Sequence, residues 1–345
     1  MNDDIARMPP VQYARTSDGM RVAFLVAGHG PPVVVLPWHQ SHIGRRWSLE
    51  LGSWSRHLAE HFQVTTYDSR GQGLSTRDLD REPTMAELRM DLEAVLQAAK
   101  LDHAVLVAYG GFAHLALRYA IDNPDRVDAL VLVCTCESFS AWPLAGMITL
   151  AEENWDLFVD LLTAKLPPDF KERAVAYIKA AATAEDYVRL VRAFSSSSVT
   201  DLLGQVRHPA LILHSLDQHW LSVDEGTRFA AKVEGARLVF LDGDVEPNDV
   251  EGTRAIRSFI AELGIGRLGT DALPIGSEAV DGRLTERQVE VLRLIASGKT
   301  NREIAGTLVL SERTVERHIA DVYAKIGARN RVEATTFALR AFAAG

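Results

Sequence analysis

Cysteine is nearly absent from this chain: only Cys134 and Cys136 occur among its 345 residues. One residue separates them in a segment that we expect to be a strand, and so short a loop disfavours a disulfide. Two cysteines alone are also a poor zinc site, so buried free thiols are expected. The cysteine content therefore gives no sign of a disulfide framework.

Long apolar runs are absent too, and none approaches the ~18 residues that a membrane-spanning helix needs. The first residues, Met1-Asn2-Asp3-Asp4, are acidic and lack the basic and apolar regions of a signal peptide. A hydrophobic fraction of 47% with 24% charged residues is ordinary for a globular chain. We expect a cytoplasmic protein, and its length predicts about two domains.

Positive charge is scarce in most of the chain but not at its end. From Arg283 onward there are 11 Lys and Arg against 7 Asp and Glu, whereas the preceding residues carry 26 against 39. An acidic body with a small basic tail is typical of a soluble domain joined to a nucleic-acid reader. This asymmetry becomes informative only when a motif supports it.

Strand-like apolar runs alternate with helical patterns from residue 20 to residue 265, including helices expected at Met85–Ala99 and His114–Asn123. Such alternation predicts an α/β fold with a mostly parallel sheet covered by helices on both faces. The expected strands are Met20–Ala27, Pro32–Leu36, Gln63–Tyr67, Ala104–Ala108, Ala129–Cys134, Ala210–His214 and Arg237–Leu241.

One loop and the order of these elements carry a family resemblance. The segment Asp68-Ser69-Arg70-Gly71-Gln72-Gly73-Leu74-Ser75 follows a strand and matches the pattern D-x-R-G-x-G-x-S. Residues 11–265 thereby resemble the α/β-hydrolase family. The resemblance implies a helical cap at about residues 137–200, where the parallel-sheet pattern gives way to helical stretches. We expect an α/β-hydrolase-like domain over residues 1–265.

The resemblance also implies where catalytic groups should lie. The strand, turn and helix of Ala104–Tyr119 have the form of a nucleophile elbow, in which G-x-S-x-G presents a serine. Here the five positions are Ala108-Tyr109-Gly110-Gly111-Phe112, so the serine position holds Gly110. Glycine has no side chain that could attack a substrate.

At three further catalytic positions this chain also lacks the residues that the α/β-hydrolase family has there. Pro37 and Trp38 stand where the family has a His-Gly oxyanion element. Gln218, beside Asp217, takes the position of the acid, and Val245 takes that of the histidine. With four linked elements changed, we expect the domain not to be an enzyme. A hydrolase with an unconventional site is the alternative.

Other candidate catalytic groups have weaker patterns. The serines at 138, 140 and 195–198 lie outside any elbow, and a polar serine run is typical of a loop. His39 and His42 have H-x-x-H spacing, but no Glu follows in metalloprotease order. We therefore expect neither a metal nor a cofactor.

A capped pocket with aromatic walls is the functional site that the resemblance implies, and such pockets bind small, mostly apolar molecules. An alternative is that the aromatics fill a vestigial site and the domain serves as an interaction or dimerisation module. His114 and His214 either reach this pocket or are satisfied at element ends. The expected ligand-binding residues are Trp38, His39, Tyr109, Gly110, Phe112, Trp142, Trp155, His219 and Trp220.

After a Gly-rich linker at residues 266–282, four helical patterns follow. The first begins after a Thr285 cap and reaches Ala296, and the second begins at Thr300. The third runs from an N-cap at Ser311 to Lys325 or Ile326, and the fourth is Arg331–Phe342. A four-helix domain is therefore expected over residues 283–345.

This string resembles the LuxR-type (FixJ-like) helix-turn-helix family. The signature pieces in register are Leu284-Thr285, Glu290-Val291-Leu292, Asn301-Arg302-Glu303-Ile304-Ala305, Ser311, Thr314-Val315, His318, Lys325-Ile326-Gly327 and Arg331. The resemblance implies that the third helix enters the major groove of double-stranded DNA and that the last helix pairs two copies into a homodimer.

The DNA-contacting residues follow from the recognition helix and its surroundings, while Val315 and Ile319 are expected to pack inward. Glu316 stands where the family often has Lys, so base preference is not carried over from the family. The expected DNA-binding residues are Asn301, Ser311, Arg313, Thr314, Glu316, Arg317, His318 and Lys325.

Overall fold

The computed structural model describes residues 8–48, 54–139, 144–166, 168–216, 221–241, 249–266, 286–296, 299–308, 312–326 and 334. The chain divides into two compact units, Met1–Arg267 and Leu268–Gly345.

The first unit is built on an eight-stranded sheet in the order β1-β2-β4-β3-β5-β6-β7-β8. β2 pairs antiparallel with β1 and β4, and all other neighbouring strands are parallel. The expected mostly parallel α/β fold is confirmed. The strands are β1 (Gln12–Arg15), β2 (Arg21–Ala27), β3 (Pro32–Val35), β4 (Gln63–Tyr67), β5 (Ala104–Tyr109), β6 (Val127–Val133), β7 (Ala210–Ser215) and β8 (Arg237–Leu241).

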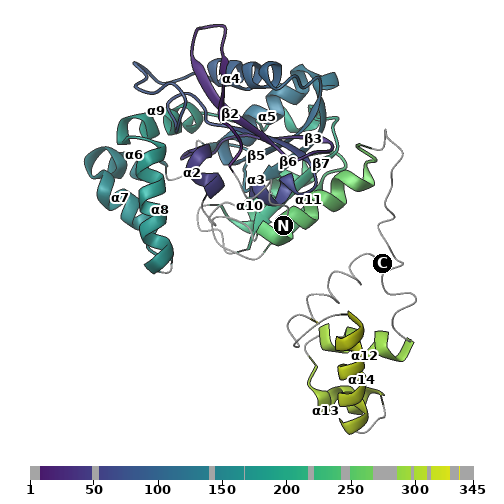
Figure 1. Ribbon diagram of the computed structural model, residues 1–345. Coiled ribbons are helices and arrows are strands. Elements are labelled where there is room, and N and C mark those ends of the chain that lie inside the picture. Colours follow the sequence, from purple (N-terminus) through teal and green to yellow (C-terminus); the bar gives the residue numbers. More distant parts are fainter. Residues whose placement is uncertain are drawn as a thin grey trace. The chain divides into compact units, whose positions relative to one another are not determined.

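Helices cover both faces of this sheet (Figure 1). The helices α4 and α5 lie on one face and α3 and α11 on the other, while α6 to α9 form a separate helical group beside the sheet (Figure 1). Their bounds are α2 (Ile43–Ser48), α3 (Trp54–Ala59), α4 (Met85–Ala98), α5 (Gly110–Asp122), α6 (Leu144–Glu153), α7 (Trp155–Leu162), α8 (Pro168–Ala181), α9 (Ala184–Ser195), α10 (Val223–Ala231) and α11 (Asp249–Glu262). The two short 3₁₀ helices are Pro124–Arg126 and Leu203–Gln205.

Local sequence explains why these elements form where they do. Every residue of β5 is buried, as expected of a central strand between two layers of helices. At the start of α4, Thr84 and Glu87 form a capping box that satisfies backbone N–H groups at the first turn. Two glycines, Gly110 and Gly111, then allow β5 to turn directly into α5.

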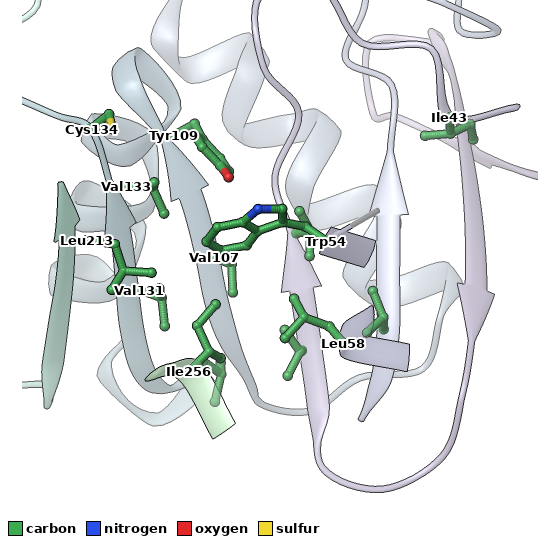
Figure 2. Close-up of a cluster of buried hydrophobic side chains, with 14 of the residues drawn as sticks. Ile43, Trp54, Leu58, Val107, Tyr109, Val131, Val133, Cys134, Leu213 and Ile256 are labelled. Carbon is green, nitrogen blue, oxygen red and sulfur yellow. The ribbon is translucent and has the colours of Figure 1, made fainter. Parts of the chain in front are cut away.

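The buried side chains form one cluster on each face of the sheet. Figure 2 shows the cluster on the α3 and α11 face, with the Trp54 indole lying across the sheet near Val107. Trp54 is fully buried, and an added Cβ at Gly252 of α11 would lie 2.4 Å from its ring. The glycine thus allows α11 to approach the indole closely.

The two cysteines require one correction. We expected them on a strand, but β6 ends at Val133, and Cys134 has a φ of +43°, outside the extended region. The two residues therefore lie in the turn after β6 rather than two apart along one strand. Both are buried and neither forms a disulfide, as expected. Burial raises the pKa of the Cys136 thiol to about 12, which keeps it protonated.

The second unit contains α12 (Glu286–Ala296), α13 (Asn301–Leu308) and α14 (Glu312–Ile326). These bounds agree with the first three expected helices within a few residues. Its core includes Val315 and Ile319, so the expected inward packing of these two residues is confirmed. The fourth expected helix and the linker lie outside the described residues, apart from Ala334, which is buried. No helix in the described parts of either unit is long and apolar enough to cross a bilayer.

Candidate functional site

The elbow between β5 and α5 keeps the geometry of a nucleophile turn at a residue that has no side chain. Gly110 begins α5 with a φ of +47°, a left-handed conformation that favours glycine. A Cβ added there would lie 3.6 Å from His39 Cε1 and 4.0 Å from the Cys134 carbonyl oxygen. Because these are ordinary contact distances, the space beside Gly110 admits a small side chain.

The next residue is glycine for a different reason. A Cβ added at Gly111 would lie 2.6 Å from Cγ of Phe194, which is fully buried at the end of α9. The elbow and the last turn of α9 therefore approach more closely than any other residue allows. Glycine at 111 allows Phe194 to pack against the elbow, whereas glycine at 110 leaves the space of the nucleophile side chain unfilled.

Beside the elbow lies the loop that follows β3. The Trp38 ring meets the Tyr109 ring edge-on at 5.1 Å, and its indole N–H donates to Gln40 Oε1 at 3.1 Å. The amide of Gln72 donates to the Trp38 carbonyl at 2.8 Å. On its other side Tyr109 meets Trp54 at 5.7 Å, and Figure 2 shows these two rings approaching each other above the sheet.

Among the described residues, His39 is the titratable group nearest to Gly110. Burial lowers the pKa of His39 to about 4, so its ring is neutral at pH 7. Within the described parts of the chain its ring nitrogens have no hydrogen-bond partner, while the ring packs on Phe194 at 5.7 Å. A neutral imidazole of this kind can donate one hydrogen bond and accept another.

The loop at residues 68–75 holds the Trp38 loop in place. The buried carboxylate of Asp68 accepts hydrogen bonds from Ser41 Oγ at 2.8 Å and from the backbone N–H groups of Ile43 and Leu74, both at 2.9 Å. A Cβ added at Gly73 would lie 2.1 Å from Asp68 Oδ2, which explains the glycine. The motif thus ties the loop after β4 to the loop after β3.

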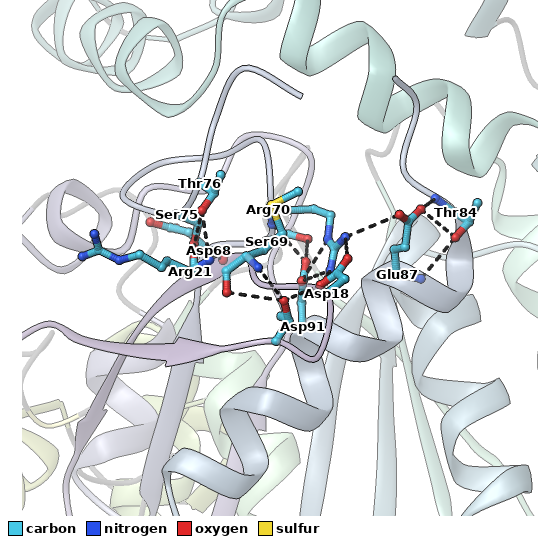
Figure 3. Close-up of polar contacts among 12 residues, drawn as sticks. Asp18, Arg21, Asp68, Ser69, Arg70, Ser75, Thr76, Thr84, Glu87 and Asp91 are labelled. Atoms are coloured by element: carbon cyan, nitrogen blue, oxygen red, sulfur yellow. Dashed lines mark hydrogen bonds and ion pairs between the residues drawn. The ribbon is translucent and has the colours of Figure 1, made fainter. Parts of the chain in front are cut away.

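A second set of interactions anchors the same motif to α4 (Figure 3). Arg70, which is almost fully buried, binds Asp91 at 2.8 Å and Asp18 at 2.7 Å. Ser69 Oγ donates to the other oxygen of Asp91 at 3.0 Å. These side chains bind other residues of the domain. The motif therefore positions the site without supplying a reactive group to it.

His114 belongs to the core rather than to a pocket. Its Nε2 lies 2.8 Å from the Cys136 carbonyl, which only accepts, so Nε2 carries the proton and donates. Its Nδ1 therefore accepts from Ser197 Oγ at 2.8 Å. Burial lowers the pKa of His114 to about 4. His214 is likewise fully buried, with Nε2 3.3 Å from the Leu221 carbonyl.

The structure brings together four of the expected ligand-binding residues: Trp38, His39, Tyr109 and Gly110. Phe112 is buried on the opposite face of the sheet and meets the His39 ring at 6.4 Å. Trp155 does not join them, because it stacks on Phe158 and Tyr187 among the cap helices. Trp142, His219, Trp220, Gln218 and Val245 lie outside the described residues.

Trp54 and Phe194 were not expected near this site. Trp54 comes from α3, whose pattern is too short to stand out in the sequence, and Phe194 comes from the end of the cap. The glycines that face them, Gly252 and Gly111, are the sequence signal that marks a close approach.

Seven of the eight expected DNA-binding residues lie on α13 and α14 of the second unit. Asn301, Thr314 and His318 are half-buried. Lys325 is exposed, and its ammonium donates to Gln288 Oε1 of α12 at 2.8 Å. Arg313, Glu316 and Arg317 lie on α14, but their side chains are not among those described, and Ser311 lies outside the described residues.

Comparisons with known proteins agree with both halves of this description. The family model "alpha/beta hydrolase fold" matches residues 47–243, and the model "Bacterial regulatory proteins, luxR family" matches residues 282–338. The first unit is therefore an α/β-hydrolase domain and the second a LuxR-family DNA-binding regulator domain. The chain belongs to the α/β-hydrolase fold family.

Individual relatives match one half or the other. The transcriptional regulatory protein LiaR of Bacillus subtilis is 37% identical over 93 residues, which are 26% of this chain and 41% of LiaR. The chain thus spans less than half the length of that curated relative. A hydrolase structure from Pseudomonas aeruginosa PA01 covers 74% of this chain and 99% of its own, with a TM-score of 0.61 and 22% identity. The structure of bromoperoxidase from Bacillus anthracis covers the same shares at 17% identity and a TM-score of 0.62. At these identities the structures show the fold alone.

The neutral state of His114 predicts a pH dependence of stability. Its pKa is about 4 in the folded chain and 6.5 when exposed, so the unfolded chain binds more protons between these values. The free energy of unfolding should fall as the pH drops from 6.5 to 4, by about 3 kcal/mol from this residue. Urea unfolding followed by tryptophan fluorescence measures it, because all six tryptophans lie in the first unit.

His114→Asn should remove this share of the slope, while His103→Asn, at an exposed histidine, should leave it in place. An unchanged slope in the His114 variant would contradict the buried neutral ring.

Proposed function

We propose that this chain is a ligand-responsive transcriptional regulator in which an inactive α/β-hydrolase domain senses a small molecule and controls DNA binding. The observation that carries the proposal is Gly110. At the point where the fold presents its nucleophile, the backbone has the required turn and the side chain is missing. The second unit gives such a domain a role that does not need catalysis.

Loss of catalysis has further support in the sequence. Gln218 and Val245 occupy the positions that the family gives to the acid and the histidine. His39 lies close to Gly110, but a base without a nucleophile cannot perform acyl transfer. The loop motif at residues 68–75 does not replace them, since Asp68 is bound by Ser41 and Arg70 by Asp91 and Asp18.

The chemistry around Gly110 favours a small, mostly apolar ligand that carries one neutral polar group. Trp38 and Tyr109 supply aromatic groups beside Gly110, and His39 supplies the neutral donor and acceptor. Such a ligand would change DNA binding only by favouring one arrangement of the chain over another. Double-stranded DNA and a second copy, paired through the last helix, complete the proposed set of partners in the cytoplasm.

A first test asks whether the domain hydrolyses esters. Neither the native chain nor Gly110→Ser should release p-nitrophenol from p-nitrophenyl acetate or butyrate above the buffer rate, because the acid and histidine are replaced. The added side chain has room beside His39 but is strained by the left-handed φ of residue 110, so tryptophan fluorescence must first show that the variant folds. Turnover by either protein would refute the proposed inactivity.

A second test concerns the ligand. Mass spectrometry of the full chain under native and denaturing conditions should reveal a small molecule bound at about one per chain after gentle purification. Trp38→Ala should lose this molecule, because the indole forms one wall beside Gly110. The matched variant Leu161→Ala, at a leucine that is 58% exposed on α7, should retain it. Equal retention in both variants would place the molecule elsewhere.

A third test concerns DNA. Arg317→Ala combined with Lys325→Ala should weaken binding to a short duplex and lower the slope of log affinity against log salt by about 2, because each cation is expected to neutralise one phosphate. Fluorescence anisotropy over a salt series measures both quantities. Lys179→Ala on α8 of the first unit removes a comparable charge and should change neither. Unaltered binding by the double variant would refute the assignment of α14 as the recognition helix.

A further inference from the structure

The free edge of β8 differs from the other end of the sheet. Among the described residues β7 alone pairs with β8, so the outer edge of β8 has no neighbouring strand. Its sequence is Arg-Leu-Val-Phe-Leu, with one charge, no proline and no register shift against β7. Phe240 is 40% exposed, and Leu216, directly after β7, is 50% exposed.

The opposite edge strand is protected in the usual ways. β1 has only four residues, two of them polar, and the guanidinium of Arg21 covers the Tyr13 ring at 4.6 Å. Natural sheets keep their edges short, charged, bulged or interrupted by proline so that other chains do not pair with them. β8 has none of these protections along Leu238–Leu241, which indicates an edge that is used.

The backbone direction at β8 determines which groups are available. The Leu216 N–H donates to the Leu241 carbonyl, so the polar groups of Leu241 face β7. Because these groups alternate along a strand, those of Val239 also face β7. The N–H and C=O groups of Leu238 and Phe240 then point outward, to the open edge.

An antiparallel copy of the same strand fits these outward groups. With a two-fold axis through Val239, Leu238 lies opposite Phe240 of the second copy, and this pair exchanges both hydrogen bonds. Leucine against phenylalanine is a favourable cross-strand pair, and it occurs twice by symmetry. The two copies of Arg237 lie at opposite ends of the ladder, about 13 Å apart along the strands, so no like charges face each other.

We propose that the β8 edge of the hydrolase domain pairs with β8 of a second copy of this chain, in an antiparallel register centred on Val239. The choice of a second copy as the partner rests on the proposed DNA-reading function, since two-fold readers match two half-sites. This contact is distinct from the pairing of the last helices. A five-residue ladder falls short of the roughly 1,000 Å2 of a stable interface, so the contact is modest in affinity.

Cysteine cross-linking in the full-length chain tests the register. Two copies of Val239 form a closely spaced pair, with Cα atoms about 4.5 Å apart, which suits a disulfide. Val239→Cys should therefore give a covalent dimer under mild oxidation on a non-reducing gel. Leu238→Cys is the matched control, because its two copies lie about 8 Å apart and cannot be bridged. The native thiols are buried and should give no background.

Sedimentation velocity of the full-length chain tests the energetics. Phe240→Lys places a charge opposite Leu238 twice in each dimer and should raise the dimer Kd about tenfold or more. Leu161→Lys, the same kind of change at an exposed leucine of α7, should leave the Kd within about twofold. Phe240→Pro is a second variant, which removes the outward N–H together with the phenyl ring, and it should act in the same direction.

The outcomes separate this inference from the proposed function. Failure of Val239→Cys to cross-link, equal cross-linking by Leu238→Cys, or an unchanged Kd in both Phe240 variants would overturn the β8 contact. A native chain that stays monomeric at every concentration would overturn it as well. DNA affinity measured on the same samples reports the second unit independently, so a failed β8 pairing with intact DNA binding refutes only the pairing.

Discussion

The carboxylate of Asp68 is the group on which the geometry of the candidate site depends. Among the described residues no cation lies at hydrogen-bond distance from this buried carboxylate, and three donors from the loops after β3 and β4 satisfy it instead. Burial raises its pKa, while these donors and the nearby His42 oppose that shift. Since an unsatisfied buried carboxylate is costly, the two loops must adopt the arrangement that supplies the donors. That arrangement is what places Trp38 and His39 beside Gly110.

This constraint explains why one part of the family pattern is present while another has changed. The loop motif at residues 68–75 stabilises the fold through Asp68, Arg70 and Gly73, so its loss would cost the domain its structure. The nucleophile position has no such structural role: Gly110 sits in a turn that glycine adopts readily, and no atom from other parts of the described chain would lie closer than 3.6 Å to an added Cβ. A sequence can therefore keep the scaffold and lose the chemistry without strain. The residues that stabilise this fold, such as Asp68 and Arg70, are therefore different from the residue at the nucleophile position, Gly110.

The alternation of apolar runs predicted seven of the eight strands, because parallel strands buried on both faces read as continuous apolar segments. β1 was not predicted, because three of its four residues are exposed and their pattern resembles a loop. At the site, Trp38, His39 and Tyr109 could be placed from their positions after β3 and at the end of β5. Trp54 and Phe194 could not, since tertiary packing of α3 and α9 brings them there and no local pattern reports it. Trp155 was expected at the site because it belongs to the cap, but its ring packs on Phe158 and Tyr187 within the cap itself.

The presence of two units makes the coupling between them the central physical question. Gly110 and His39 lie at the carboxyl end of the central strands, whereas α14 belongs to a unit with its own core. A ligand can bias such a chain only through an element that has two arrangements and binds the ligand unequally in them. The cap helix α9 is placed to do this, because Phe194 touches both the His39 ring and the elbow at Gly111. Filling the open position beside Gly110 would act first on His39, whose ring packs on Phe194 at 5.7 Å. The tight approach at Gly111 leaves Phe194 little room to adjust alone, so the end of α9 would have to move with it.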